Sequence, residues 1–383
     1  MNMIIDYMRY LLLAATVLIS TLTDETVPVA QFNAPDSTSV TLLFAGDIMQ
    51  HGPQIDAAWN EADSTYNYQP CFSYIKPVVS AYDIAIANLE VTLAGKPYTG
   101  YPQFSAPDAL AVALKDAGFD VLATANNHCC DRGKSGLVRT IQALDSINIL
   151  RTGTFRDSAD LEDHHPLILN KNDIKIALLN YTYGTNGLPV YEPTIVNQID
   201  SNRIVTDLKS ARKSDIDFVI VFFHWGNEYQ SQPTAEQELL AGLCRKNGAD
   251  AVIGSHPHVI QPMEYHAPDY SNPAGYLLIY SLGNFVSNQR DRYKDGGAMI
   301  GFTLTKTWNK KTIARPEYHL TWVYNPIENG RKTYYILPVK PSESDTFPDS
   351  SSIRKLKQFT NDSRDLLNTG KFTVPEFRPG DQQ

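Results

Sequence analysis

The sequence predicts an α/β fold, in which buried strands alternate with amphipathic helices. Seven short apolar runs are spread between residues 40 and 280, and four stretches with helical periodicity lie between them. Five of the seven runs are followed directly by Asp, Glu, His or Asn. Because ligands of open α/β sheets bind beyond the carboxyl ends of the strands, this second observation also predicts where the functional site lies.

The composition is that of a globular protein with one large domain or two modest ones. Of its 383 residues, 43% are hydrophobic and 20% are charged, so a sizeable core can form. The net charge of -9 argues against nucleic acid as a partner, since binding to phosphates needs a basic surface. Nine histidines against four cysteines, two of them adjacent, favour nitrogen and oxygen ligands over a disulfide framework or a thiolate site.

The N-terminus is typical of an export segment. Residues 10–20 are apolar and follow Arg9; the stretch is too short to span a bilayer but matches a secretory h-region. We therefore expect an exported protein, periplasmic or associated with the cell envelope. Residues 1–25 would be a signal peptide or membrane anchor and residues 26–38 a linker. The alternative is an N-terminal helix that packs on the domain.

Each predicted strand is a nearly continuous apolar run, as expected of strands buried on both faces. The runs occupy residues 40–45, 84–87, 120–124, 174–179, 218–223, 250–253 and 276–280. Three further strands, at residues 298–304, 317–323 and 334–337, follow one another without intervening helices. We expect these three to be antiparallel additions at a sheet edge, completing a domain of residues 39–340.

The helices are predicted from caps and apolar periodicity. Ser105, with Pro107 and Asp108 in the first turn, predicts a helix start, and Gly118 predicts its end. The four predicted helices occupy residues 105–118, 133–147, 199–214 and 234–247. Residues 341–383 are expected to hold a polar linker, one amphipathic helix and a tail that is poorly ordered after Thr369.

The segment Gly254-Ser255-His256-Pro257-His258 is the clearest candidate metal-binding motif. In an extended chain, residues at i and i+2 point to the same side. Pro257 favours an extended or polyproline conformation at His256. We therefore expect both imidazoles to be presented together at the end of a strand, and neutral imidazole is the commonest metal ligand.

Further oxygen and nitrogen donors follow the other strands. They are Asp47, His51, Glu90, Asn127, His128 and His224. Together with the two motif histidines they suffice for two divalent cations with one bridging carboxylate. His128 could stay unligated and protonate a leaving group, and Arg132 could face an anionic substrate. Taken singly, each residue could instead be a helix cap, a surface charge or a core histidine.

In this order the motifs resemble the CapA family of bacterial proteins linked to poly-γ-glutamate capsule synthesis. The motifs are Asp47 to His51, Asn88-Leu89-Glu90, Asn126-Asn127-His128, His224-Trp225-Gly226 and Gly254 to His258. The family is similar to the calcineurin-like metallophosphoesterases, and the resemblance covers roughly residues 40–305. It implies a four-layer α/β/β/α sandwich of two mixed sheets with a metal site at their shared rim.

The resemblance also implies roles by position. Asp47, His51 and His258 would hold one metal, Asn127, His224 and His256 the other, and Glu90 would bridge them. His128 would donate a proton. Arg132, Asn284 and Asn88 are assigned to substrate binding. The ions would be Zn, Mn or Fe.

Two positions depart from the metallophosphoesterase pattern. His51 lies four residues after Asp47, where that pattern has Asp-x-His. Glu90 in Asn88-Leu89-Glu90 stands where the pattern has Gly-Asp-x-x-Asp.

We therefore expect a metal-dependent hydrolase that cleaves a phosphoester or a γ-glutamyl amide in an anionic polymer or another anionic envelope substrate. One alternative is a non-catalytic accessory component of polyglutamate or polysaccharide synthesis and export, which binds the polymer or the membrane components that make it. Another is a sugar- or peptide-binding envelope protein whose rim has lost its metals.

Overall fold

The computed structural model describes residues 37–270, 272–339 and 349–378. The expected export segment at residues 1–25, and all but the last two residues of the expected linker at 26–38, lie outside the described residues. Among the described helices, none combines the length and the apolar character that a membrane span requires.

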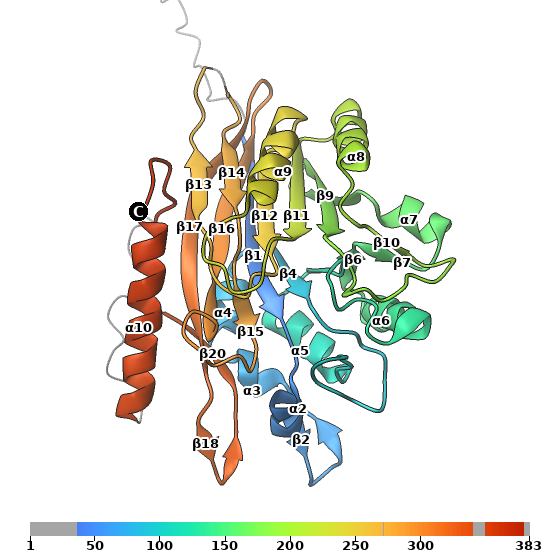
Figure 1. Ribbon diagram of the computed structural model, residues 1–383. Coiled ribbons are helices and arrows are strands. Elements are labelled where there is room, and N and C mark those ends of the chain that lie inside the picture. The colour runs from blue at the N-terminus through green and yellow to red at the C-terminus, as the bar shows by residue number, and fades with distance from the viewer. Residues whose placement is uncertain (1–36, 271, 340–348, 379–383) are drawn as a thin grey trace, which may run out of the picture. The chain divides into compact units, whose positions relative to one another are not determined.

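The first of two mixed sheets is built around the opening strand (Figure 1). Its members are β1 (Thr38–Ile48), β4 (Ile84–Leu89), β5 (Val121–Ala123), β6 (Leu150–Thr152), β15 (Asn284–Val286), β16 (Gly296–Lys306), β17 (Lys311–Tyr324) and β20 (Tyr335–Pro338). The order is β20-β17-β16-β1-β4-β5-β6, with β15 paired to β1. The pairs β1–β4–β5–β6 are parallel and the pairs β1–β16–β17–β20 are antiparallel. The three late strands are thus the antiparallel additions that their pattern predicted.

The second sheet comes from the middle of the chain. It contains β8 (Leu167–Lys171), β9 (Ile174–Thr182), β11 (Phe218–His224), β12 (Ala251–Ser255), β13 (Met263–His266) and β14 (Tyr276–Ile279). Its order is β13-β14-β12-β11-β9-β8, parallel except for the two edge pairs. All seven predicted apolar runs are therefore strands.

The two sheets pack face to face. Phe44 of β1 and Phe222 of β11 meet edge to face with ring centroids 5.6 Å apart, inside a core shared by both sheets. Leu43, the next residue of β1, points the other way and joins a core made with helices. A strand buried on both faces reads as a continuous apolar run, which is why residues 40–45 show no alternation.

Helices cover the outer faces. α3 (Gln69–Phe72), α4 (Lys76–Val79) and α5 (Ala109–Ala117) pack on the first sheet, and α8 (Ser201–Lys213) and α9 (Ala235–Lys246) pack on the second. The layers are therefore helix, sheet, sheet and helix, which confirms the four-layer sandwich.

The 14-residue helix α6 (Gly133–Ser146) contributes Leu144 to the core of the first sheet. Further short elements are α2 (Gly52–Ala58), β2 (Trp59–Asn60), β3 (Thr65–Tyr66), β7 (Thr154–Phe155), α7 (Ser158–His164), β10 (Ile195–Val196), β18 (Ile327–Glu328) and β19 (Arg331–Lys332).

The predicted start of one helix was wrong. α5 begins at Ala109, after an N-cap at Asp108. Ser105 lies in a short antiparallel bridge to Thr99 and its hydroxyl donates to the carbonyl of Gly95. Because Ser105 already has these partners, it does not cap the helix.

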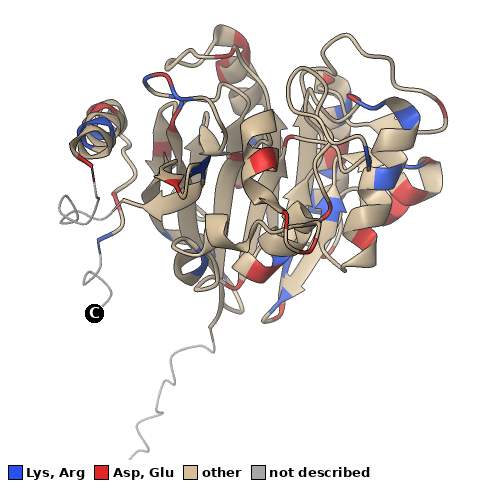
Figure 2. Cartoon of the chain, turned by 90° about the horizontal axis from the view of Figure 1, so that it is seen from below, with Lys and Arg blue, Asp and Glu red and all other residues tan. Residues whose placement is uncertain are grey.

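The end of the described chain is also more ordered than its composition predicts. α10 (Ser350–Leu367) buries Leu356 and Phe359 in the core, and its exposed side carries basic residues, visible in blue at the left of Figure 2. Beyond it, the N–H of Phe377 donates to the carbonyl of Tyr318 at 2.8 Å. The expectation of a poorly ordered tail after Thr369 was wrong for residues up to 378, because backbone pairing with β17 holds them.

Strand register places the functional rim. Asp47 of β1 lies opposite Asn88 of β4 on one side and Asn284 of β15 on the other. In the second sheet, His224 lies opposite Ser255. The N–H of Asp47 donates to the carbonyl of Gly283 at 3.0 Å. A Cβ on Gly46 would lie 2.0 Å from that carbonyl oxygen, so only glycine allows this approach.

Candidate metal centre

Five predicted ligands from two sheets meet at one rim. Asp47 lies near the end of β1, Glu90 follows β4, His224 ends β11, and His256 and His258 follow β12. All five side chains are buried, none more than 3% exposed. Polar side chains this deep need partners or a bound ion.

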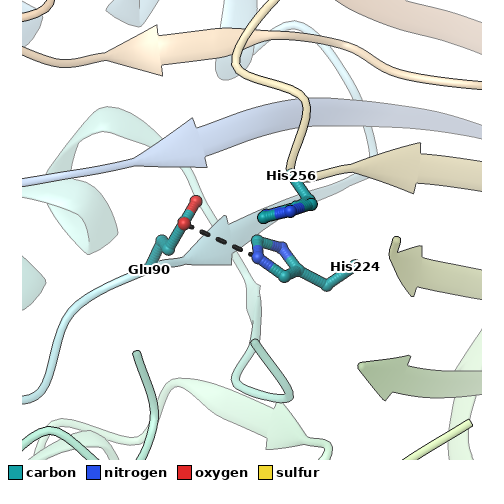
Figure 3. A group of neighbouring side chains, drawn as sticks. All are labelled: Glu90, His224 and His256. Atoms are coloured by element: carbon teal, nitrogen blue, oxygen red, sulfur yellow. Dashed lines mark ion pairs between the residues drawn. The ribbon is translucent and has the colours of Figure 1, made fainter. Parts of the chain in front are cut away.

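The five residues form two groups that share Glu90. Potential ligand atoms of Asp47, Glu90 and His258 lie within 4.8 Å of one another, and so do those of Glu90, His224 and His256. Glu90 Oε1 is 3.5 Å from His224 Nε2 and 3.7 Å from His258 Nε2. Figure 3 shows Glu90 pointing at the imidazoles of the second group. A carboxylate between two ligand sets has the position of a bridge between two cations.

Two buried atoms of the cluster are left without hydrogen bonds. Glu90 Oε1 and His256 Nδ1 find no hydrogen-bond partner among the described residues. Burial, and then the neighbouring Asp47 carboxylate, raise the pKa of Glu90 well above its ordinary value. A cation placed between these atoms would satisfy both and offset the repulsion between the carboxylates, so the donor set fits divalent metal ions.

Two histidines of the cluster, His224 and His256, favour their neutral, metal-binding form. Burial, followed by the charges of the other histidines, lowers the pKa of His224 well below its usual value and that of His256 to about 3. Burial alone would raise the pKa of Asp47, but a hydrogen bond from His258 and further polar contacts outweigh it and lower the pKa. The centre therefore combines an ionised carboxylate with imidazoles that keep a free lone pair.

Asparagines surround these ligands. Asn127 Oδ1 lies 3.0 Å from His224 Nε2, so both could face a common ion, and the metal role of Asn127 stays a prediction. Asn88 Nδ2 donates to Asp47 Oδ1 at 2.8 Å, and Asn284 Oδ1 lies 3.1 Å from His258 Nδ1. Asn88 and Asn284 thus orient candidate ligands; their predicted contact with a substrate stays a prediction.

His128 lies beside this cluster and is held by a carboxylate. Its Nδ1 is 2.8 Å from Asp131 Oδ2, and its ring packs edge-on against Phe104. His128 is next in sequence to Asn127, whose Oδ1 lies 3.0 Å from His224 Nε2, and this places it beside the cluster. Sequence reasoning missed Asp131, although its spacing of three residues from His128 was a usable signal.

His51 and Arg132 lie outside the ligand groups. In the part of the chain that the structure describes, none of the three groups of potential ligands includes His51. His51 caps α2, accepts a hydrogen bond from the N–H of Asn288 at Nδ1, and has its pKa lowered to about 4, mainly by burial. Arg132 is half-buried and donates to the hydroxyl of Thr99. The metal role of His51 and the substrate role of Arg132 stay predictions.

The backbone of the histidine motif is not extended, contrary to expectation. His256 has φ 100° and His258 has φ 58°, both in the left-handed region. The N–H of His256 donates to Asp47 Oδ2 at 3.3 Å and the carbonyl of His258 accepts from Asn284 Nδ2. These contacts hold a backbone that non-glycine residues rarely adopt, a strain that concentrates at functional sites.

The open side of the centre is lined by residues that sequence reasoning did not assign to the site. A carboxylate oxygen of the exposed Glu228 lies within 4.8 Å of ring nitrogens of His256 and His258. The half-exposed rings of Tyr183 and Tyr229 lie 4.5 Å from His256 and 6.0 Å from His258. Only the fold brings these residues, which lie on two separate loops, to the histidine rings.

Comparison with known proteins identifies relatives of this chain. Residues 41–289 match the family described as "Bacterial capsule synthesis protein PGA_cap". The chain is 26% identical over 366 residues to "Capsule biosynthesis protein CapA" of Bacillus anthracis, covering 92% of this chain and 80% of the relative. It is 28% identical over 339 residues to "PGA biosynthesis protein CapA" of Bacillus subtilis (strain 168), covering 83% and 78%.

Two nucleotidases are among the solved structures that are partly similar in fold to this chain. The NAD nucleotidase (NadN) of Haemophilus influenzae is 12% identical with a TM-score of 0.47, covering 90% of this chain and 65% of that one. The 5'-nucleotidase from Candida albicans SC5314 is 10% identical with a TM-score of 0.38, covering 70% and 48%.

Proposed function

Because the chain belongs to the bacterial capsule synthesis protein family PGA_cap, we propose that it is an exported, metal-dependent hydrolase of the cell envelope. Its substrate is an anionic polymer or another anionic envelope molecule, cleaved at a phosphoester or a γ-glutamyl amide. The observation that carries the proposal is the pair of buried ligand groups that share Glu90.

Two divalent cations, Zn, Mn or Fe, would be held by this donor set. Asp47 and His258 would hold one ion, His224, His256 and Asn127 the other, and Glu90 both. When bound, such ions make water more acidic and stabilise negative charge on reacting oxygens.

The protein's own contribution to proton transfer is the pair His128 and Asp131. Because Nδ1 of His128 is engaged by the Asp131 carboxylate, Nε2 is the nitrogen available to a substrate. Asp131 fixes the orientation of the ring. His128 then delivers a proton from Nε2 to the leaving oxygen or nitrogen.

An anionic substrate would be bound by local positive charges rather than by the overall charge of the chain. A protein with a net charge of -9 binds an anionic polymer only through local cations. Arg132 and Lys294 would supply them together with the metals; the ammonium of Lys294 lies 4.3 Å from the ring centroid of Tyr229 and is also paired with Asp291. Components of a membrane-bound capsule-synthesis system are further proposed partners.

The test begins with metal analysis of the purified full-length chain. We expect about two ions per chain, lost on chelation together with hydrolysis. His256→Ala should lower the metal content. His266→Ala, which changes a half-buried histidine that contacts Glu264 and Phe372, is the matched control and should keep it.

Activity is then measured on bis-4-nitrophenyl phosphate and on γ-glutamyl peptides. Metal-dependent turnover of either, abolished in His256→Ala but not in His266→Ala, would support the proposal. Full metal occupancy without turnover of both substrate types would replace it with the non-catalytic accessory role in polymer synthesis.

A further inference from the structure

Two opposite charges lie beside the ring of Tyr229, at the open side of the candidate metal centre. A carboxylate oxygen of Glu228 lies within 4.8 Å of ring nitrogens of His256 and His258. Nζ of Lys294 lies 4.3 Å from the centroid of the Tyr229 ring. Glu228 is exposed, Tyr229 is 49% exposed and the side chain of Lys294 is 19% exposed. A molecule that enters from solvent can therefore reach both charges.

The carboxylate of Glu228 faces the centre, as its distance from the two imidazoles shows. It also forms a hydrogen bond with the phenol of Tyr229. Burial, followed by the charge of Glu228 and this hydrogen bond, raises the pKa of Tyr229, so the phenol stays neutral. A carboxylate in this place attracts a cation to the open side of the centre and repels an anion.

The backbone around Glu228 is fixed by buried contacts. The N–H of Tyr229 donates to the carbonyl of Pro257, in the histidine motif, at 2.7 Å. Tyr229 has φ 64°, in the left-handed region that non-glycine residues rarely adopt. Nε2 of the buried Gln261 donates to the carbonyl of Gln230 at 2.8 Å. Such a held, strained backbone is typical of functional sites, and here it keeps Glu228 beside the histidines.

Glu228 differs from the proposed metal ligands in its exposure. The five ligands of the two groups that share Glu90 are at most 3% exposed, whereas Glu228 is exposed. Together with Asn127, those five already provide donors for two cations. Since the metals do not need Glu228 and solvent reaches it, its carboxylate is available to a substrate.

Lys294 is tied to the centre through Asn284. Nδ2 of Asn284 donates to the carbonyl of Lys294 at 2.8 Å, and Oδ1 of Asn284 lies 3.1 Å from Nδ1 of His258. The ammonium pairs with Asp291 at 2.6 Å, but the side chain of Asp291 is 82% exposed. Because solvent screens such a pair, the carboxylate of a ligand can replace Asp291. Lys294 therefore offers a positive charge beside the centre.

We propose that Glu228 and Lys294 recognise the α-amino acid head group of a γ-glutamyl residue at a free amino end. The ammonium binds Glu228 and the α-carboxylate binds Lys294. Every other α-nitrogen of a γ-glutamyl chain is an uncharged amide, so only the terminal residue matches both charges. A phosphoester would bring only negative charge to Glu228, and the arrangement therefore favours the amide over the phosphoester.

The inference rests on the proposed function, because it names the end of the chain at which cleavage occurs. The bond between the γ-carbonyl carbon of the terminal residue and the amide nitrogen breaks. The hydroxyl of a water molecule bonds to that carbon, and the remaining proton of the water passes to the nitrogen. The products are free glutamate and a chain that is one residue shorter, again with a free amino end.

The probe is glutamate, the released product, which carries both charges and needs no hydrolysis. N-acetylglutamate lacks the ammonium and 4-aminobutyrate lacks the α-carboxylate, so each is a matched control for one charge. Binding of both enantiomers is measured by calorimetry on the full-length, metal-loaded chain. We expect each control to bind at least about tenfold more weakly than the better glutamate enantiomer, since one hydrogen bond between charged groups is missing.

Two variants assign each charge to its residue. In Glu228→Gln, glutamate should bind no better than N-acetylglutamate, while its preference over 4-aminobutyrate is kept. In Lys294→Met, the preference over 4-aminobutyrate should be lost and the other kept. Glu236→Gln, which changes an exposed carboxylate in the first turn of α9, is the matched control and should keep both. Metal content should be the same in all three variants and the wild type.

The inference is overturned if glutamate does not saturate the wild-type chain, if N-acetylglutamate binds equally well, or if Glu228→Gln keeps both preferences. Loss of metal in Glu228→Gln would make this residue a metal ligand and would overturn it as well. Hydrolysis of γ-glutamyl peptides is measured in parallel. Turnover without the two preferences would leave the proposed function and remove the inference, whereas the expected binding without turnover would support the recognition and contradict the hydrolysis.

Discussion

His128 Nδ1 and Asp131 Oδ2 lie 2.8 Å apart, and both side chains are buried beside the candidate metal centre. Asp131 also accepts the N–H of Phe104 at 2.7 Å, and the Phe104 ring packs against His128. The imidazole is thus held on two sides. A buried ring held in this way suits the proton-donor role proposed for His128.

Replacing this donor should matter most when the leaving group is poor. We expect His128→Ala to slow hydrolysis of alkyl phosphoesters or γ-glutamyl amides by about 10²-fold or more. Release of 4-nitrophenolate needs no proton, so the effect should be much smaller with bis-4-nitrophenyl phosphate. Metal content should not change. Equal loss on both substrate types would assign His128 to metal binding or structure.

The carboxylate partner can be tested separately. Asp131→Asn keeps the size of the side chain but removes the negative charge beside the His128 ring, so it should slow the same poor substrates. Since the two residues act as a unit, the double variant should be little worse than His128→Ala alone. Additive losses, measured as kcat/KM for the single and double variants, would contradict the coupling.

Glu90→Gln should have opposite effects with and without metal. The variant loses the shared carboxylate, so its metal content should fall. In EDTA it should be more stable than the wild type, by about 1–3 kcal/mol, because a buried carboxylate next to Asp47 is removed. Denaturant unfolding with EDTA and with added metal measures both effects. A less stable metal-free variant would show that Glu90 is satisfied without a cation.

Away from the centre, Asp160 gives the chain a dependence on acid pH. Burial alone would raise its pKa, but hydrogen bonds from Arg151 and from the N–H of Arg156 outweigh it and lower the pKa from 3.8 to about 2. Because the folded-state pKa is below the unfolded one, this stabilisation is present above pH 3.8 and is lost as the pH falls towards 2.

Asp160→Asn should therefore destabilise the protein by about 2 kcal/mol at neutral pH, and by less as the pH falls through that window. Unfolding in urea across the pH series measures this difference. Asp215→Asn, at an exposed ion pair with Lys175, is the control and should change the stability little, because solvent screens such a pair. A difference for Asp160→Asn that does not shrink at low pH would contradict the assignment.

The close approach of Gly46 to Gly283 links stability to the site. Gly46→Ala would place a methyl group 2.0 Å from the Gly283 carbonyl oxygen. We expect it to destabilise the chain by about 1–3 kcal/mol and to lower metal binding, because Asp47 is the next residue. Gly52→Ala, where an added Cβ meets nothing within 4 Å, is the matched control. Equal metal binding and stability in the two variants would contradict this account.

The sequence alone was sufficient for the α/β class, for all seven buried strands and for most of the residues at the rim. These properties depend on the local sequence. A strand buried on both faces needs a continuous apolar run, and a ligand at the end of a strand needs a polar residue there. The positions of Asp47, Glu90, His224, His256 and His258 could be predicted for this reason.

Tertiary structure decided how those residues meet. The left-handed backbone of His256 depends on its contact with Asp47, and the start of α5 depends on the contact of Ser105 with Thr99; no local pattern reports either contact. The approach of Lys294 to the ring of Tyr229, beside Glu228, is a further case, because these residues come from separate loops. The local sequence determines which secondary structure a residue prefers. The distances between site residues from distant segments are determined only by how the two sheets pack.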